Sequence, residues 1–141
     1  MNEKRIKLAR LLVTVPALFL AVVPPLVDFN STHVTNPLWT GHARLHTVWL
    51  LSTNSIIAVL ALGLMWRELK IASVRAGAVL TAAPLVGFFI AAATRSLYGG
   101  AFTDPNGVAQ RIGFLDANLA MFSLWILVIL AAFGLLWKVD R

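Results

Sequence analysis

The chain has 141 residues, of which 59% are hydrophobic and 13% are charged, and its formal net charge is +6. A soluble domain is about 45–50% apolar and about 25% charged, so a soluble fold of this length could not bury so much apolar surface. The chain has no cysteine, which excludes disulfides, iron–sulfur clusters and cysteine nucleophiles. The composition therefore predicts a protein that has lipid as its solvent.

Four long apolar runs cover most of the chain, at residues 8–27, 45–66, 76–93 and 112–137. A helix needs about 20 apolar residues to cross about 30 Å of hydrocarbon, and these runs lack the alternation of a barrel strand. We therefore predict an all-α polytopic membrane protein, a single domain over residues 1–141 built as a bundle of four transmembrane helices. The predicted helices span about residues 8–27, 43–66, 76–95 and 110–137, with outer loops at 28–42 and 96–109.

The basic residues lie mostly on one side of the predicted membrane. Nine of them are on the side of the two termini, namely Lys4, Arg5, Lys7, Arg10, Arg67, Lys70, Arg75, Lys138 and Arg141. The other three, Arg44, Arg95 and Arg111, lie on the opposite side. The positive-inside rule then places both termini of this integral membrane protein in the cytoplasm. Anionic lipid headgroups are a sufficient partner for the basic side, so no nucleic-acid partner is predicted.

The opposite, outer side collects most of the polar side chains. It carries all three histidines, three aspartates and several amides: His33, His42, His46, Asp28, Asp104, Asp116, Asn30, Asn36, Asn106, Gln110 and Asn118. The three arginines on this side balance the three aspartates, so these groups can pair with one another. We predict a functional site on this side.

The start of the second helix carries two histidines four residues apart. At about 100° per residue, His42, His46 and Trp49 fall on one stripe of the helix. The two histidines can act as acid/base groups or share a ligand. No cofactor is predicted, and the alternative is a divalent metal held by Asp28, His33, His42 and His46 if the outer loop folds back over the helix. A second alternative is that these are interfacial residues and that Trp49 belongs to an aromatic belt.

The second outer loop follows the third helix, in which Pro84 and Gly87 predict a kink. Arg95 and Tyr98 share a face of this helix and are predicted to point into the bundle together. Asp104 stands directly before a proline, which is typical of a helix N-cap followed by the first helical residue.

Asp116 lies more than a turn inside the fourth apolar run. A charge within a transmembrane helix costs about 2.5–3.5 kcal/mol, so this carboxylate should face the interior and have a partner. Arg95 is the predicted partner, with His42 or His46 as the alternative. The Arg95–Asp116 pair is either purely structural or part of the functional site. Asn54, in the second helix, is predicted to form an interhelical hydrogen bond.

The outer loop and the start of the second helix follow a pattern that reads Asp28-x-Asn30-x-Thr32-His33, Asn36-Pro37-x-Trp39 and His42-Ala43-Arg44-x-His46-x-x-Trp49. This pattern resembles the signature of a family of small, mostly uncharacterised four-helix membrane proteins of bacteria and fungi. The resemblance implies that these residues form a shared site, and it implies no particular reaction. In architecture alone, the chain is also similar to the emopamil-binding-protein and sigma-2-receptor group, whose bundles hold a lipophilic ligand among acidic and aromatic residues.

These observations predict a pocket at the outer end of the bundle that is open to lipophilic small molecules. The predicted catalytic residues are His42, His46, Asp28 and Asp116, and the predicted ligand contacts are His33, Asn30, Trp49, Arg95, Tyr98 and Asn118. Proton transfer suits histidine, so the predicted reactions are isomerisation, cyclisation or hydration. The rival function is non-catalytic, as an accessory subunit of a membrane complex or a lipophilic-ligand-binding protein. A homo-oligomer or a larger membrane complex is compatible with either function.

Overall fold

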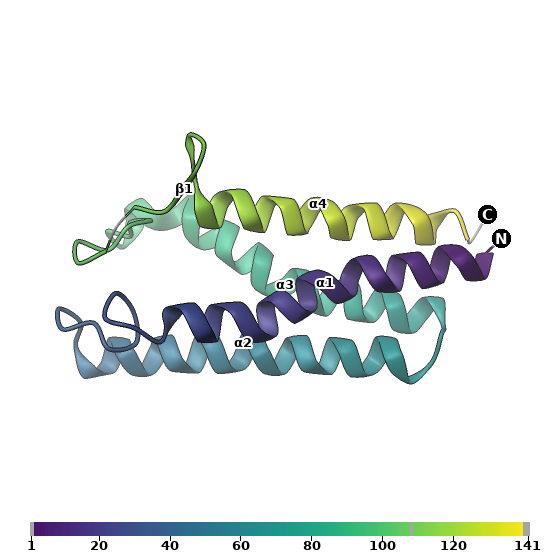
Figure 1. Ribbon diagram of the computed structural model, residues 1–141, viewed down its shortest axis with the longest axis horizontal. Coiled ribbons are helices and arrows are strands. Elements are labelled where there is room, and N and C mark those ends of the chain that lie inside the picture. Colours follow the sequence, from purple (N-terminus) through teal and green to yellow (C-terminus); the bar gives the residue numbers. More distant parts are fainter. Residues whose placement is uncertain (1, 108, 140–141) are drawn as a thin grey trace.

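A computed structural model describes residues 2–107 and 109–139. Four antiparallel helices run the length of the molecule (Figure 1): α1 (Asn2–Asp28), α2 (Gly41–Arg67), α3 (Ile71–Thr94) and α4 (Ala117–Trp137). A short helix, η1 (Arg95–Leu97), follows α3, and two short strands, β1 (Arg111–Ile112) and β2 (Leu115–Asp116), precede α4. Each of the four long helices is long and apolar enough to cross a membrane. The predicted all-α, four-helix membrane fold is confirmed.

The fourth helix begins later than predicted. Residues 110–116 do not extend α4, because β1 and β2 pair as an antiparallel hairpin with Ile112 opposite Leu115. Gly113 turns the chain at a φ of 62°, a left-handed conformation that glycine adopts without steric cost. Asp116 is the N-cap of α4, and its side chain accepts hydrogen bonds from the N–H groups of Asn118 and Leu119. The predicted start at residue 110, and with it the position of Asp116 inside the helix, is wrong.

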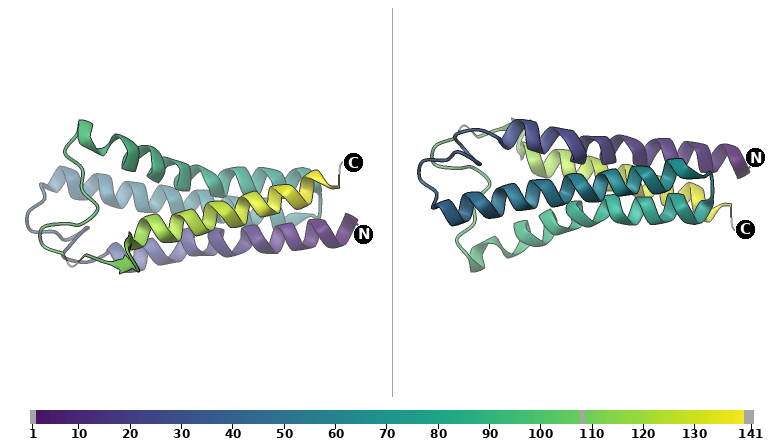
Figure 2. Two further views of the ribbon diagram at one scale, coloured as in Figure 1. Left: turned by 90° about the horizontal axis from the view of Figure 1, so that it is seen from above. Right: turned by 90° about the horizontal axis from the view of Figure 1, so that it is seen from below.

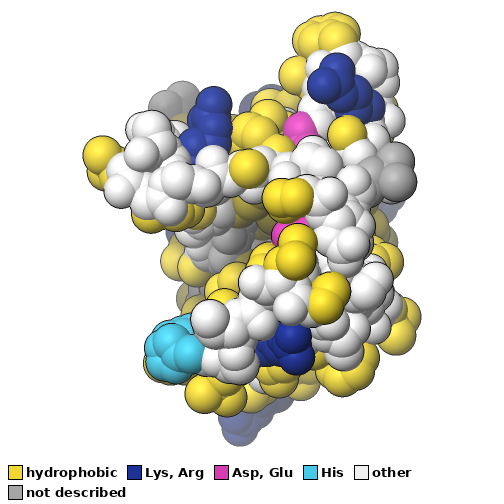
Figure 3. All heavy atoms as spheres, turned by 90° about the vertical axis from the view of Figure 1, so that its left-hand side faces the viewer, with side chains coloured by type: hydrophobic (Ala, Val, Ile, Leu, Met, Phe, Trp, Pro, Cys, Tyr) yellow, Lys and Arg dark blue, Asp and Glu magenta, His cyan; other side chains and the backbone are white. Residues whose placement is uncertain are grey.

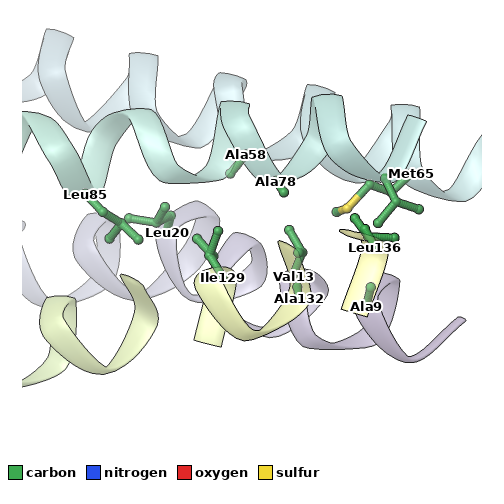
Figure 4. Close-up of a cluster of buried hydrophobic side chains, with 11 residues drawn as sticks. Ala9, Val13, Leu20, Ala58, Met65, Ala78, Leu85, Ile129, Ala132 and Leu136 are labelled. Atoms are coloured by element: carbon green, nitrogen blue, oxygen red, sulfur yellow. The ribbon is translucent and has the colours of Figure 1, made fainter. Parts of the chain in front are cut away.

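The helices pack closely at the end where both termini lie. Side chains from all four helices form one core there (Figure 4): Ala9, Val13, Leu20, Ala58, Met65, Val74, Ala78, Leu85, Ile129, Ala132 and Leu136. Many of these residues are small, which lets backbones approach one another in lipid. At Gly77 a Cβ atom would overlap the side chain of Met65, so any larger residue at position 77 would force Met65 to move.

The bundle loosens towards its other end, which we call the outer end. Over the whole length of the bundle, α1 packs against α2, α3 and α4, whereas α2 and α4 lie on opposite sides and have no Cα pair within 8 Å among the described residues. Figure 2 shows the last turns of α3 leaning away from the other helices. Pro84 lies inside α3, and a proline within a helix removes a hydrogen bond and bends the axis. The divergence of α3 leaves space between the outer halves of the helices.

Candidate functional site

A cavity of about 1170 Å³ occupies the outer half of the bundle. Apolar side chains from all four helices form its inner part: Leu20, Leu51, Ile57, Pro84, Phe88 and Phe122. Polar side chains surround its mouth: Asp28, Asn30, Thr32, His33, Asp104, Asn106, Gln110, Asp116 and Asn118. Asn54 is a polar residue of the deeper lining, beyond Leu51 along α2. Pockets that bind small molecules have this composition, mostly apolar with a few convergent polar groups, at about 300–1,000 Å³.

The cavity mouth is held by hydrogen bonds between the two outer loops. Asn36 is completely buried, and its amide nitrogen donates to the Thr32 carbonyl at 3.0 Å and to Asp104 Oδ2 at 2.9 Å. The indole nitrogen of Trp39 donates to the same Asp104 oxygen at 3.2 Å. Asn106 Nδ2 reaches back to the carbonyl of Ser31 at 2.9 Å. Loops that are about 70 residues apart in the sequence are thereby joined over the cavity.

Asp104 has a different structural role from the predicted one. No helix begins after it, because Asp104 caps a turn in which its Oδ1 accepts from the Asn106 N–H and its carbonyl accepts from the Gly107 N–H. Asp-Pro sequences suit such turns as well as helix starts. The second Asp104 oxygen is therefore available for Asn36 and Trp39. The prediction of a helix N-cap is wrong, and the residue instead links the two loops.

Asp28, Thr32 and His33 form a connected group at the end of α1. The Thr32 hydroxyl donates its single proton to Asn30 Oδ1 at 2.7 Å, so it can only accept from His33 Nδ1, 2.8 Å away. His33 therefore carries a proton on Nδ1, and in the neutral form of the ring the lone pair is on Nε2. The Asp28 carboxylate lies 3.8 Å from the same Nδ1. The Asp28 and His33 side chains are 27% and 42% exposed, so both remain accessible from the cavity.

The His42 and His46 side chains share one face of α2, as the sequence predicts, but they do not line the cavity. Their Nε2 atoms are 3.0 Å apart, and the His46 ring lies 5.6 Å from the ring of Trp49. All three residues are exposed, Trp49 by 64%. Within the described residues no three His, Cys, Asp or Glu side chains are grouped to hold a metal. The four-ligand site of Asp28, His33, His42 and His46 is therefore not formed.

Arg95 and Tyr98 also lie outside the cavity. Arg95 Nη1 donates to the Ala92 carbonyl at 2.7 Å, and its guanidinium stands 5.1 Å from the ring of Phe102. The Tyr98 hydroxyl donates to the Ala91 carbonyl at 2.6 Å. Both side chains bond back to α3 and are exposed, so the expectation that they point into the bundle is wrong.

The predicted Arg95–Asp116 ion pair is absent from the described residues, although Glu3–Lys7 and Glu68–Lys70 are paired. Asp116 instead satisfies backbone N–H groups at the start of α4.

We expect Arg95→Met to change the free energy of unfolding by less than about 0.5 kcal/mol, as for an ordinary surface position. Asp116→Ala should cost about 1 kcal/mol through the lost N-cap, and Asp116→Ser should restore most of that stability. Denaturant unfolding in detergent measures both, and a loss of several kcal/mol in Arg95→Met would contradict the geometry.

At the outer end, the acidic and the basic side chains lie in different places relative to the cavity. All three outer aspartates line the cavity, whereas none of the three outer arginines does. Arg111 is exposed and stands opposite Asp116 in the hairpin. Figure 3 looks onto this end and shows acidic side chains recessed among hydrophobic ones, with basic and histidine side chains further forward. The cavity therefore has an acidic mouth although the outer side as a whole is neutral.

Four helices that are long and apolar enough to span a membrane, with a cavity between their outer halves, define a small polytopic membrane protein. Over residues 12–135 the chain matches the model of a family of unknown function, DUF6640, and it belongs to that family. This agrees with the expectation of an uncharacterised family, whereas the residue signature on which the resemblance was based is not confirmed. No curated protein and no solved structure matches the chain. The similarity to the emopamil-binding-protein and sigma-2-receptor group is not confirmed.

Proposed function

We propose that this protein binds a lipophilic small molecule in the cavity between the outer halves of its four helices. The observation that carries this proposal is the cavity itself, because its inner part is lined by side chains such as Leu51, Phe88 and Phe122 and its mouth by polar groups. An amphiphilic molecule fits such a lining with its apolar part inward. The cavity lies among transmembrane helices, so its ligand can partition from the lipid.

The polar end of the ligand is best matched by a hydrogen-bond donor, and above all by a protonated amine. Asp28 receives no hydrogen bond from the described residues, and the ring nitrogen Nδ1 of His33 lies 3.8 Å from its carboxylate. A half-buried carboxylate without a donor is costly, and a ligand N–H removes that cost. Asp104 and Asp116 add negative charge to the mouth, which disfavours anionic headgroups such as phosphate or a fatty-acid carboxylate.

A second candidate function is proton-transfer catalysis, and the specific observation that favours it is the arrangement of His33. Its Nδ1–H is held by Thr32 beside Asp28, so its Nε2 is free to act as a base. In an isomerisation, Nε2 would take a proton from one carbon of the substrate and return it to another, so that a double bond moves without a co-reactant. The acid/base role thereby passes from His42 and His46 to His33, with Asp28 beside it.

The binding proposal is tested with a long-chain alkyl amine that carries a photoreactive diazirine. We expect this probe to label the inner cavity of the full-length protein in lipid nanodiscs, near Phe88 and Phe122. Asp28→Asn should reduce labelling by about tenfold or more, because a hydrogen bond to a charged group contributes about 1.5–3 kcal/mol. Glu68→Gln makes the same chemical change in the loop between α2 and α3 and should have no effect. Equal labelling by the corresponding alkyl carboxylate would contradict the proposed charge preference.

We further propose that the cavity opens on the extracytoplasmic side, with both termini in the cytoplasm. The two termini lie at one end of the bundle and the cavity at the other, and the basic residues flank the end with the termini. Cysteines introduced at the exposed positions Thr35 and Ala72 should differ in intact cells. A membrane-impermeant maleimide should label residue 35 and leave residue 72 unlabelled until the membrane is broken. The reverse pattern would invert the orientation.

A further inference from the structure

The His42–His46 pair is a second polar feature of the outer end, and the proposed ligand site does not use it. Both histidines lie in the first two turns of α2 and are exposed, and neither lines the cavity. Their rings meet at a centroid distance of 4.5 Å, with the two Nε2 atoms 3.0 Å apart. At that separation one Nε2 donates a proton to the lone pair of the other.

The separation of the two nitrogens also matches that of two ligands on one metal ion. Imidazole nitrogens bind ions such as Zn²⁺ at about 2.0–2.1 Å, which places two of them about 2.9–3.4 Å apart for ligand angles between a right angle and the tetrahedral angle. The observed 3.0 Å lies within this range. Metal binding would replace the shared proton without requiring a new backbone conformation. The aromatic contact of His46 with Trp49, at 5.6 Å, helps to fix one of the rings.

We propose that His42 and His46 together bind one divalent transition-metal ion at the outer end of α2. Imidazole suits Cu²⁺, Ni²⁺ and Zn²⁺, whereas Ca²⁺ and Mg²⁺ prefer oxygen ligands. No third His, Asp, Glu or Cys within the described residues joins the pair, so the remaining coordination positions are open to water. Cu²⁺ is expected to bind most tightly of the three because it stands highest in the order of divalent-metal affinities.

Copper titration of the full-length protein without a polyhistidine tag tests this site. We expect one Cu²⁺ per chain by calorimetry, with two nitrogen ligands visible in the electron paramagnetic resonance spectrum. The deciding variant exchanges two exposed residues of α2, His46→Val with Val48→His. It keeps the composition and the number of histidines but puts them six residues apart, on different faces of the helix.

The exchanged variant should lose this binding event, and His46→Ala should lose it too. His33→Ala should retain it, because His33 lies in the cavity mouth. Unchanged stoichiometry and spectrum in the exchanged variant would overturn the proposal, as would loss of binding in His33→Ala. The measurement does not involve the cavity, so its result is independent of the proposed ligand site.

Discussion

Replacing Asn36 by alanine is expected to destabilise the protein by about 3–5 kcal/mol. The Asn36 side chain is completely buried and forms three hydrogen bonds, with the Thr32 carbonyl, Asp104 and the N–H of Leu38. Alanine would leave these groups without partners, and each uncompensated buried polar group costs about 1–3 kcal/mol. Because Trp39 still donates to Asp104, the total should fall below the simple sum. Such a loss is a large fraction of the stability of an ordinary domain, about 5–15 kcal/mol.

The measurement is denaturant unfolding of the purified protein in detergent, with Thr35→Ala as the matched control. Thr35 is the neighbouring residue and is exposed, so its truncation should change stability by less than about 0.5 kcal/mol. Asn36→Ala should also reduce ligand binding, because Thr32, Asn106 and Gly107 line the cavity mouth that Asn36 helps to hold. If Asn36→Ala unfolds at the same denaturant concentration as the wild type, the two loops are not joined through this residue.

The four helices could be predicted from the sequence because hydropathy reports directly on the length of chain that can cross a bilayer. The start of α4 could not, because residues 112–115 are almost as apolar as a helix segment and hydropathy does not distinguish them from one. The local signals there are a glycine at 113 and an N-capping aspartate at 116. Both are typical of a turn followed by a helix start, and they outweigh the apolar character of the run.

The members of the candidate site could be predicted only in part. Asp28, Asn30, His33, Asp116 and Asn118 line the cavity. These residues lie near the outer ends of α1 and α4. They therefore reach the mouth of the cavity however α2 and α3 are rotated about their own axes.

The spacing of His42, His46 and Trp49 correctly predicts that they share one face of α2, but it does not show in which direction that face points. Spacing shows which side chains share a face, and an amphipathic pattern normally shows which face is buried. A helix that is apolar on all sides gives no such signal in lipid. The prediction that Arg95 and Tyr98 point into the bundle is wrong for the same reason. Both side chains extend outward and donate to carbonyls of α3.

Asn36 and Asn54 show what the sequence could not indicate. Asn36 is the most buried polar residue of the outer loops, yet its sequence context, an Asn-Pro step in a polar loop, is typical of an exposed turn. Its burial depends on Asp104, which comes from the other loop. Asn54 lines the cavity and forms no interhelical hydrogen bond among the described residues. The hydroxyl of its neighbour Ser55 instead donates to the Ala21 carbonyl of α1 at 3.1 Å, so the hydrogen bond predicted for Asn54 is wrong.

Filling the cavity from α3 is expected to abolish ligand binding while leaving the fold intact. Ala83 and Gly87 are one helical turn apart and both line the cavity. A Cβ atom at Gly87 would have no neighbour within 4 Å, so a larger side chain there enters open space. Replacing glycine inside a helix also favours the helical conformation by up to about 1 kcal/mol. The double variant Ala83→Phe/Gly87→Phe should therefore remain folded.

The matched control is Val59→Phe/Gly63→Phe on α2, which has the same spacing. Both control residues are exposed, a Cβ atom at Gly63 also meets nothing within 4 Å, and neither residue lines the cavity. Both double variants introduce two phenyl rings and remove one helical glycine each, and the control adds somewhat less volume because Val59 is larger than Ala83. They differ in whether the added rings enter the cavity or face away from it.

Quantitative photolabelling of these two variants by the diazirine-bearing alkyl amine, in lipid nanodiscs, tests the ligand site most directly. We expect at least about tenfold weaker labelling near Phe88 and Phe122 in Ala83→Phe/Gly87→Phe, with an unchanged unfolding midpoint. We expect wild-type labelling in Val59→Phe/Gly63→Phe. Wild-type labelling at the same residues in the cavity-filled variant would show that the probe is bound elsewhere, and that the cavity is not the ligand site.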